Sequence, residues 1–239
     1  MPETPTQDRY AGDIGDYVKV ALLKHLAVGR RLGIAGYRHP DESHTDDGRH
    51  TAYLHDTNRW RALDPAVFDA LCPIPCADRS IEALRDTGLL PGSQVMEPLL
   101  PSGLPWPQRS EWRRAWFVRT VAALAACDLI FADPDNRLVD DDPRRRSRRI
   151  FAKQIPLAEA QTLAQGRVAV IYHHNTRFRG GHDAEVAHWL ERLGPGTLAV
   201  RANAWNCRTF FVLNPDAEIV ARTQAFCARW RDHAVRLHG

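Results

Sequence analysis

Two carboxylates follow an apolar stretch near the middle of the chain, in the order Asp133-Pro134-Asp135-Asn136. Proline fixes its own φ angle and disfavours a helical conformation in the residue before it, so Asp133 is expected to extend from the end of a strand. An aspartate held in this way can accept a hydrogen bond from an amino group of a cofactor or substrate. Asp135 could be a second acceptor or a metal ligand, although the same four residues also suit a plain turn.

A pair of histidines, His173 and His174, follows a second apolar stretch at residues 167–172. Adjacent side chains at the end of a strand point to opposite faces, so the two rings are not expected to bind one metal ion together. One of them, for which we take His173, could act as a base or contact a nucleobase or phosphate, while the other packs.

A third polar segment, residues 11–16, leads directly into a predicted helix. Gly12 permits close approach of a ligand to the backbone, and Asp13 and Asp16 lie at the positive end of the helix dipole. Lys19, one turn into the helix, could reach a carboxylate held at the same end. A plain helix cap followed by a surface lysine explains these residues equally well.

The next polar segment, residues 39–50, contains several histidines and carboxylates after a short apolar stretch that ends at Tyr37. Their spacing matches no zinc or calcium pattern, and the glycine arrangement of an EF-hand is absent. Cys72 and Cys76 have no second close pair to complete a zinc site, so we interpret them as structural. No metal site is therefore predicted.

These segments stand at the ends of strands in a chain that alternates between strand and helix patterns. Helices are predicted at residues 16–26, 64–71, 78–87, 109–126, 154–165, 182–193 and from 217 onward, and strands at 32–37, 51–54, 95–100, 128–132, 167–172, 197–202 and 209–213. This alternation indicates an α/β fold with a mostly parallel sheet and helices on both faces. The last two strands are too close for a parallel crossover, so they are expected to pair antiparallel. A Rossmann-like sheet of the class I methyltransferase type has this architecture.

The composition is that of a globular protein, with 239 residues, of which 44% are hydrophobic and 26% are charged. These values exclude collagen, extended disorder and a disulfide miniprotein. We expect a flexible leader at residues 1–11 and a single α/β domain at 12–239, with an irregular insertion at about 72–107. Neither a membrane span nor a signal peptide is predicted, which favours the cytoplasm. The net charge of +3 does not by itself indicate nucleic acid, and we interpret the arginine run at 144–149 as a solvated loop.

Residues 11–19, Ala-Gly-Asp-Ile-Gly-Asp-Tyr-Val-Lys, resemble the N-terminal Ala-Gly-Asn-x-Ala-Asp-x-Leu-Lys motif of bacterial large-subunit ribosomal RNA adenine-N6 methyltransferases. Asp133-Pro134-Asp135-Asn136 is similar to the Asp-Pro-Pro-Tyr signature of that family, and residues 210–215 resemble one of its late strands. The chain also resembles a group of bacterial proteins that share Gly-Asp-Ile-Gly-Asp and Asp-Pro-Asp-Asn motifs. The first resemblance implies S-adenosyl-L-methionine as cofactor and RNA or DNA as partner.

The resemblance also implies roles for individual residues. Lys19 would help to hold the cofactor, and Asp133 would orient the amino group that receives the methyl. The expected cofactor-binding residues are Gly12, Asp13, Asp16, Lys19, Tyr37 and His39, and the expected catalytic residues are Asp133, Asp135, Asn136 and His173. Two features depart from the family: residues 37–42 replace its glycine-rich turn, and Asn136 replaces the aromatic residue that stacks on the base.

Three functions remain open from the sequence. The first is an S-adenosylmethionine-dependent methyltransferase that acts on an amino group of a nucleic acid. The second is a metal-dependent hydrolase or nuclease on the same scaffold, with Asp133, Asp135 and a histidine of 173–174 as its active residues. The third is a methyltransferase-like protein that has lost catalysis and binds a partner.

Overall fold

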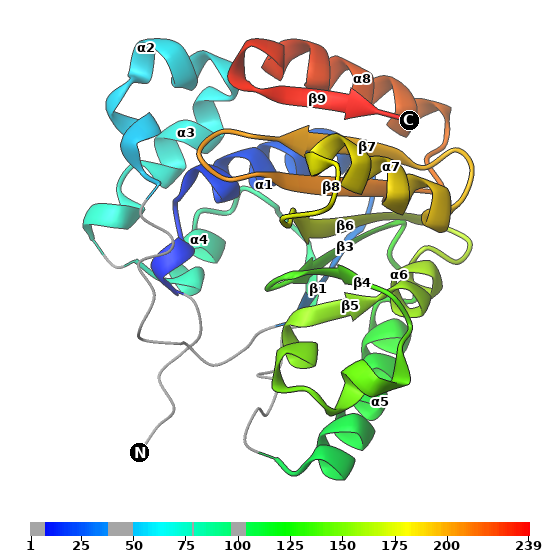
Figure 1. Cartoon of the computed structure of the whole chain (residues 1–239). Coiled ribbons are helices and arrows are strands. Elements are labelled where there is room, and N and C mark those ends of the chain that lie inside the picture. The colour runs from blue at the N-terminus through cyan, green and yellow to red at the C-terminus, as the bar shows by residue number, and fades with distance from the viewer. Residues whose placement is uncertain (1–7, 38–49, 78, 97–103) are drawn as a thin grey trace.

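A computed structural model describes residues 8–37, 50–77, 79–96 and 104–239 (Figure 1). Its helices are α1 (Ile14–Leu26), α2 (Thr57–Trp60), α3 (Pro65–Leu71), α4 (Ile81–Asp86), α5 (Trp106–Ala123), α6 (Leu157–Leu163), α7 (Gly181–Leu193) and α8 (Ala217–Trp230). Its strands are β1 (Leu32–Tyr37), β2 (Gln94–Met96), β3 (Leu129–Pro134), β4 (Arg137–Val139), β5 (Gln154–Pro156), β6 (Val168–His174), β7 (Leu198–Ala202), β8 (Arg208–Leu213) and β9 (Val235–His238). Among the helices in these ranges, none is both long and apolar enough to cross a membrane.

The main sheet has seven strands in the order β2-β1-β3-β6-β8-β7-β9, and β4 pairs with β5 in a separate small sheet. Strands β2, β1, β3 and β6 are parallel, whereas β8 lies between β6 and β7 and is antiparallel to both. Strand β9 adds an antiparallel edge beside β7. The predicted α/β fold, with a mostly parallel Rossmann-like sheet and an antiparallel strand pair, is confirmed.

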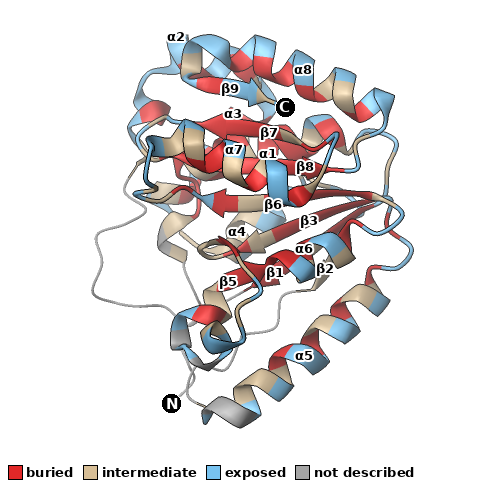
Figure 2. Cartoon of the chain, turned by 45° about the vertical axis from the view of Figure 1, so that its right-hand side comes forward, coloured by how far each residue is buried: buried red, intermediate tan, exposed pale blue. Residues whose placement is uncertain are grey.

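Side chains of the central strands alternate between two apolar layers, as period-two strands buried on both faces must. Phe131, Val170 and Phe210 pack with α1, α3 and α8 on one face, and Ile130, Ile171 and Phe211 pack with α5, α6 and α7 on the other. Figure 2 shows these strands as buried, whereas the outer surfaces of α5 and α8 are exposed. Helices therefore cover both faces of the sheet, so a ligand can reach the sheet only at the ends of its strands.

Several predicted boundaries are wrong. Residues 51–54 do not form a strand, because Ala52–His55 is a 3-10 helix, and the helix predicted from 154 begins only at Leu157, after β5. The helix predicted at 78–87 is α4, which begins only at Ile81, after its N-cap Ser80. Of the expected leader, residues 1–7 lie outside the described ranges, but Asp8–Tyr10 forms a 3-10 helix and Ala11 is buried. The antiparallel strand β9 follows the last predicted helix and is missing from the sequence-based prediction.

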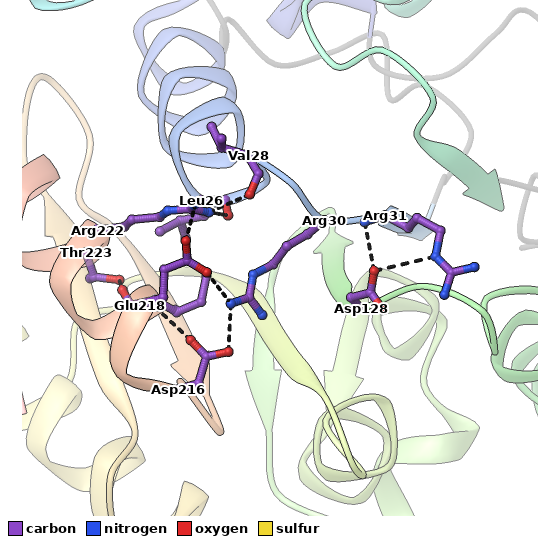
Figure 3. Close-up of polar contacts among 10 residues, drawn as sticks. Leu26, Val28, Arg30, Arg31, Asp128, Asp216, Glu218, Arg222 and Thr223 are labelled. Atoms are coloured by element: carbon purple, nitrogen blue, oxygen red, sulfur yellow. Dashed lines mark hydrogen bonds and ion pairs between the residues drawn. The ribbon is translucent and has the colours of Figure 1, made fainter.

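Hydrogen bonds and ion pairs of arginines join α1 and α8 near the amino ends of the strands (Figure 3). Arg222 of α8 donates to the carbonyl oxygens of Leu26 and Val28 at the end of α1, at 2.9 and 2.7 Å. Arg30 pairs with Asp216 at the start of α8, and Asp128 accepts the backbone N–H of Arg31. This end of the sheet is closed by direct contacts, and the polar segments identified from the sequence lie at the opposite end.

Candidate functional site

A cavity of about 770 Å³ lies at the carboxyl ends of β1, β3 and β6. Open α/β sheets bind ligands at this end of their strands, and a volume of roughly 300–1,000 Å³ is typical of small-molecule sites. The first turns of α1 form one wall. Leu84, Leu89, Leu90 and Pro91, from α4 and the segment that leads to β2, form an apolar wall.

An ammonium group joins two of the polar segments inside this cavity. The Lys19 Nζ lies 2.9 Å from Asp16 Oδ1 and 3.1 Å from Asp133 Oδ2. Burial alone would lower the pKa of Lys19, but the two carboxylates outweigh it and raise this pKa above its usual value. Burial raises the pKa of Asp133 despite the opposing effect of Lys19. Side chains of α1 and of the end of β3 therefore meet in one cavity.

Asp13 lines the same cavity and also begins α1. Its Oδ1 accepts the backbone N–H of Asp16 at 3.0 Å, as an N-cap residue does. The side chain is buried, and burial together with the neighbouring charge of Asp16 raises the pKa of Asp13 to about 6. This carboxyl group can therefore change charge within the physiological range of pH.

Asp135 and Asn136 also line the cavity, on the side of β6. Asp135 Oδ2 lies 3.1 Å from the Nζ of Lys153. The backbone of Asn136 accepts from the N–H of His174 and donates to the carbonyl of Lys153, at 2.9 and 2.8 Å. These contacts fix the turn after β3, and Asp133 and Asp135 line the cavity at this end of the strand.

His173, which is expected from the sequence to be catalytic, does not line the cavity. Its Nδ1 accepts the backbone N–H of Leu138 at 3.2 Å, so the proton resides on Nε2, which donates to Glu185 Oε1 at 3.1 Å. Burial lowers the pKa of His173, which favours the neutral ring. The histidine that lines the cavity is His174, on the opposite face of β6. Of the two rings, His173 is the one that packs.

Tyr37 and Gly12, two of the residues expected to bind a cofactor, make other contacts. Tyr37 lines the cavity, but its hydroxyl is directed away and donates to Glu159 Oε2 at 3.1 Å. Gly12 does not line it: with φ +77°, it lies against Pro75, which a Cβ atom would meet at 3.1 Å. This glycine is therefore required by backbone conformation and packing. His39 lies outside the described residues.

Sequence reasoning missed three cations of the cavity lining, Arg85, Lys153 and Arg208. Arg208 is the first residue of β8, and the antiparallel direction of β8 places it opposite His174 at the end of β6. An arginine that opens an otherwise apolar strand was the available signal, but only the pairing of β8 with β6 brings it to the cavity. Tyr172 of β6 also lines the cavity, and burial raises its pKa to about 12.

Positive and negative side chains are balanced among the described residues that line the cavity. These residues include four carboxylates and four cations, namely Asp13, Asp16, Asp133 and Asp135 with Lys19, Arg85, Lys153 and Arg208. A site for a polyanion such as a nucleoside triphosphate carries an excess of cations or a glycine-rich phosphate loop. Equal numbers of carboxylates and cations suit a ligand that carries both a positive and a negative group. The apolar wall beside them suits a planar ring.

No protein-family model matches this chain, and no curated protein matches it either.

Proposed function

We propose that this protein is an S-adenosylmethionine-dependent methyltransferase that acts on an amino group, with nucleic acid as the preferred class of acceptor. The observation that carries the proposal is the ion pair of Lys19 with Asp133 inside one cavity. The two residues belong to segments far apart in the sequence, each of which resembles a methyltransferase motif. Their atoms Lys19 Nζ and Asp133 Oδ2 lie 3.1 Å apart.

The cavity residues fit the proposed cofactor. S-adenosylmethionine has a carboxylate, an ammonium, a sulfonium and an adenosine, so it needs both charges and an apolar surface. The cavity offers Lys19 for the carboxylate, Asp13 and Asp16 for positive groups or hydroxyls, and an apolar wall between Leu84 and Pro91 for the adenine. When bound there, the cofactor supplies a methyl group activated for transfer.

Asp133 would hold the acceptor. Lys19 contacts its Oδ2 atom, so Oδ1 is the atom that would accept an N–H of the amino group and turn the nitrogen lone pair toward the methyl. Burial raises the pKa of Asp133, which makes this carboxylate a better proton acceptor than an exposed aspartate. Lys19 keeps the carboxylate fixed in one orientation.

The hydrolase alternative has less support. Asp133 and Asp135, the carboxylates that it requires, lie beside the ammonium groups of Lys19 and Lys153, which would repel a divalent cation. His173, one of its two candidate histidines, is directed toward Glu185. Within the described ranges, no three or more His, Cys, Asp or Glu side chains are grouped as a metal site would require.

A transfer assay with matched aspartate variants tests the proposal. The protein is incubated with S-adenosylmethionine labelled in its methyl group and with total bacterial RNA or DNA, and label in the polymer is counted. Asp133→Asn is expected to lower incorporation by about 100-fold or more, the usual effect of losing one group that stabilises the transition state. Asp128→Asn is the control, because Asp128 lies just before the same strand, at its other end (Figure 3).

Absence of label in both polymers with the wild-type protein would contradict a nucleic acid acceptor. Equal incorporation by Asp133→Asn and the wild-type protein would contradict the role of Asp133. A protein that has lost catalysis would give the first result while still binding the cofactor.

A further inference from the structure

A buried arginine with an unused hydrogen-bond donor lines the cavity. Arg208 has an exposed fraction of only 3%, and its side chain reaches the cavity from the first residue of β8. Its Nη1 is buried and has no hydrogen-bond partner in the described part of the chain. Buried polar groups are almost always paired, and an unpaired N–H of a charged group is especially unfavourable. This guanidinium therefore needs a further partner.

The start of α1 is shaped around this guanidinium. A Cβ atom on Gly15 would meet Asp13 Oδ1 at 2.9 Å, the Cζ of Arg208 at 3.0 Å and its Nη1 at 3.1 Å. Glycine stabilises a helix less than alanine does. At position 15, however, the missing side chain leaves the space that the guanidinium of Arg208 occupies. The arginine thus lies against the first turn of α1, where the helix dipole also favours an anion.

The chemistry of the missing partner follows from the side chain. A guanidinium is planar, remains charged, and presents its N–H groups in a fork that matches the oxygens of a phosphate or carboxylate. Asp13, the nearby acid whose charge acts on Arg208, already uses Oδ1 to cap α1 and has a pKa raised to about 6. A ligand anion is the partner that fits.

The sheet order separates Arg208 from the apolar wall of the cavity. Asp133 ends β3, the apolar wall proposed for the adenine lies toward β1 and β2, and Arg208 lies on β8, beyond β6. We propose that Arg208 binds a phosphate group of the methyl acceptor, so that the acceptor is a nucleotide whose amino group reaches Asp133. This inference rests on the proposed function for the place of the cofactor in the cavity. The conclusion that Arg208 requires an anion does not depend on the proposed function.

Binding of adenosine 5′-monophosphate and adenosine, measured by isothermal titration with S-adenosylhomocysteine at saturation, tests the inference. The wild-type protein is expected to bind the monophosphate about 10- to 100-fold more tightly, as one charged hydrogen-bonded contact gives. Arg208→Gln should reduce this ratio to near one, and Arg208→Lys should keep part of it. The control Arg30→Gln, at the other end of the sheet, should leave it unchanged.

Three outcomes would overturn the inference. A wild-type ratio near one would show that no phosphate is recognised, and a ratio unchanged in Arg208→Gln would assign the phosphate to other residues. A loss of S-adenosylhomocysteine affinity in Arg208→Gln, with the ratio preserved, would assign the anion to the cofactor. Failure of the wild-type protein to bind S-adenosylhomocysteine contradicts the proposed function instead. Binding of the monophosphate and of adenosine is then compared in the absence of S-adenosylhomocysteine.

Discussion

Asp13 shows how one residue serves both the helix and the cavity. As the N-cap it accepts a backbone N–H, which favours its charged form, but burial and the charge of Asp16 favour the neutral form and prevail. The native protein therefore keeps a proton on Asp13 up to a pH of about 6, whereas an unfolded chain loses it near the usual aspartate pKa of 3.8. Because the native state binds more protons in this interval, stability from this group is present below it and is lost as the pH rises through it.

Asp13→Asn should remove this pH dependence while keeping an oxygen for the cap. Between about pH 4.5 and pH 7.5, the free energy of unfolding of the variant should rise relative to the wild type by about 2 kcal/mol, since one pKa unit corresponds to about 1.4 kcal/mol. Urea unfolding of both proteins at the two pH values measures the difference.

Asp216→Asn is the matched control, because Asp216 also caps a helix by accepting a backbone N–H. A backbone hydrogen bond from Ile219 outweighs slight burial and lowers the pKa of Asp216, so it is ionised at both pH values and its variant should show a constant difference. A difference for Asp13→Asn that is equally constant would contradict the raised pKa.

At the scale of elements, a buried carboxylate ties the end of β6 to α7. Glu185 accepts hydrogen bonds from the side chains of His173, Asn175 and Thr176 and from the backbone of Thr176. Burial alone would raise the pKa of Glu185, but these bonds outweigh it and lower the pKa to about 2. His173, expected from the sequence to be catalytic, is thus part of the support that holds β6 beneath the cavity.

Glu185→Gln should destabilise the protein by about 3 kcal/mol, because the amide has one acceptor oxygen for four donors and loses charged hydrogen bonds. Urea unfolding at neutral pH measures the loss. Glu191→Gln, an exposed position on the same helix, should change stability by less than about 0.5 kcal/mol. Similar effects of both substitutions would show that the buried contacts do not stabilise the native state.

Elements with a strong local pattern could be predicted from the sequence. The apolar runs that became β1, β3, β6 and β8 are recognisable because a strand buried on both faces is almost wholly apolar. The 3-10 helix Ala52–His55 and the strand β9 could not, since both are short and their conformation depends on packing against distant segments. Arg208 was missed for a related reason, because its place depends on the register between β8 and β6.

At the scale of the whole molecule, chain topology brings the site together. The strand order reverses between β1 and β3: the chain goes from β1 outward to β2, returns to β3 on the other side of β1 and continues to β6, and the cavity lies over this region. Such a reversal of strand order is where open α/β sheets bind ligands. The place of the cavity and of Asp133 could be predicted from this rule, whereas the apolar wall from α4 to β2 follows an irregular segment without a sequence pattern.

Calorimetric titration of the full chain with S-adenosylhomocysteine tests the central claim most directly. The wild-type protein should bind one molecule per chain, Lys19→Met should weaken binding by about tenfold or more, and Lys24→Met should not weaken it. Lys24 is the matched control because it lies on the same helix but pairs with Asp64 rather than with a cavity carboxylate. Saturable binding that depends on Lys19 is the predicted result, and no binding heat with the wild-type protein at millimolar ligand would contradict the account.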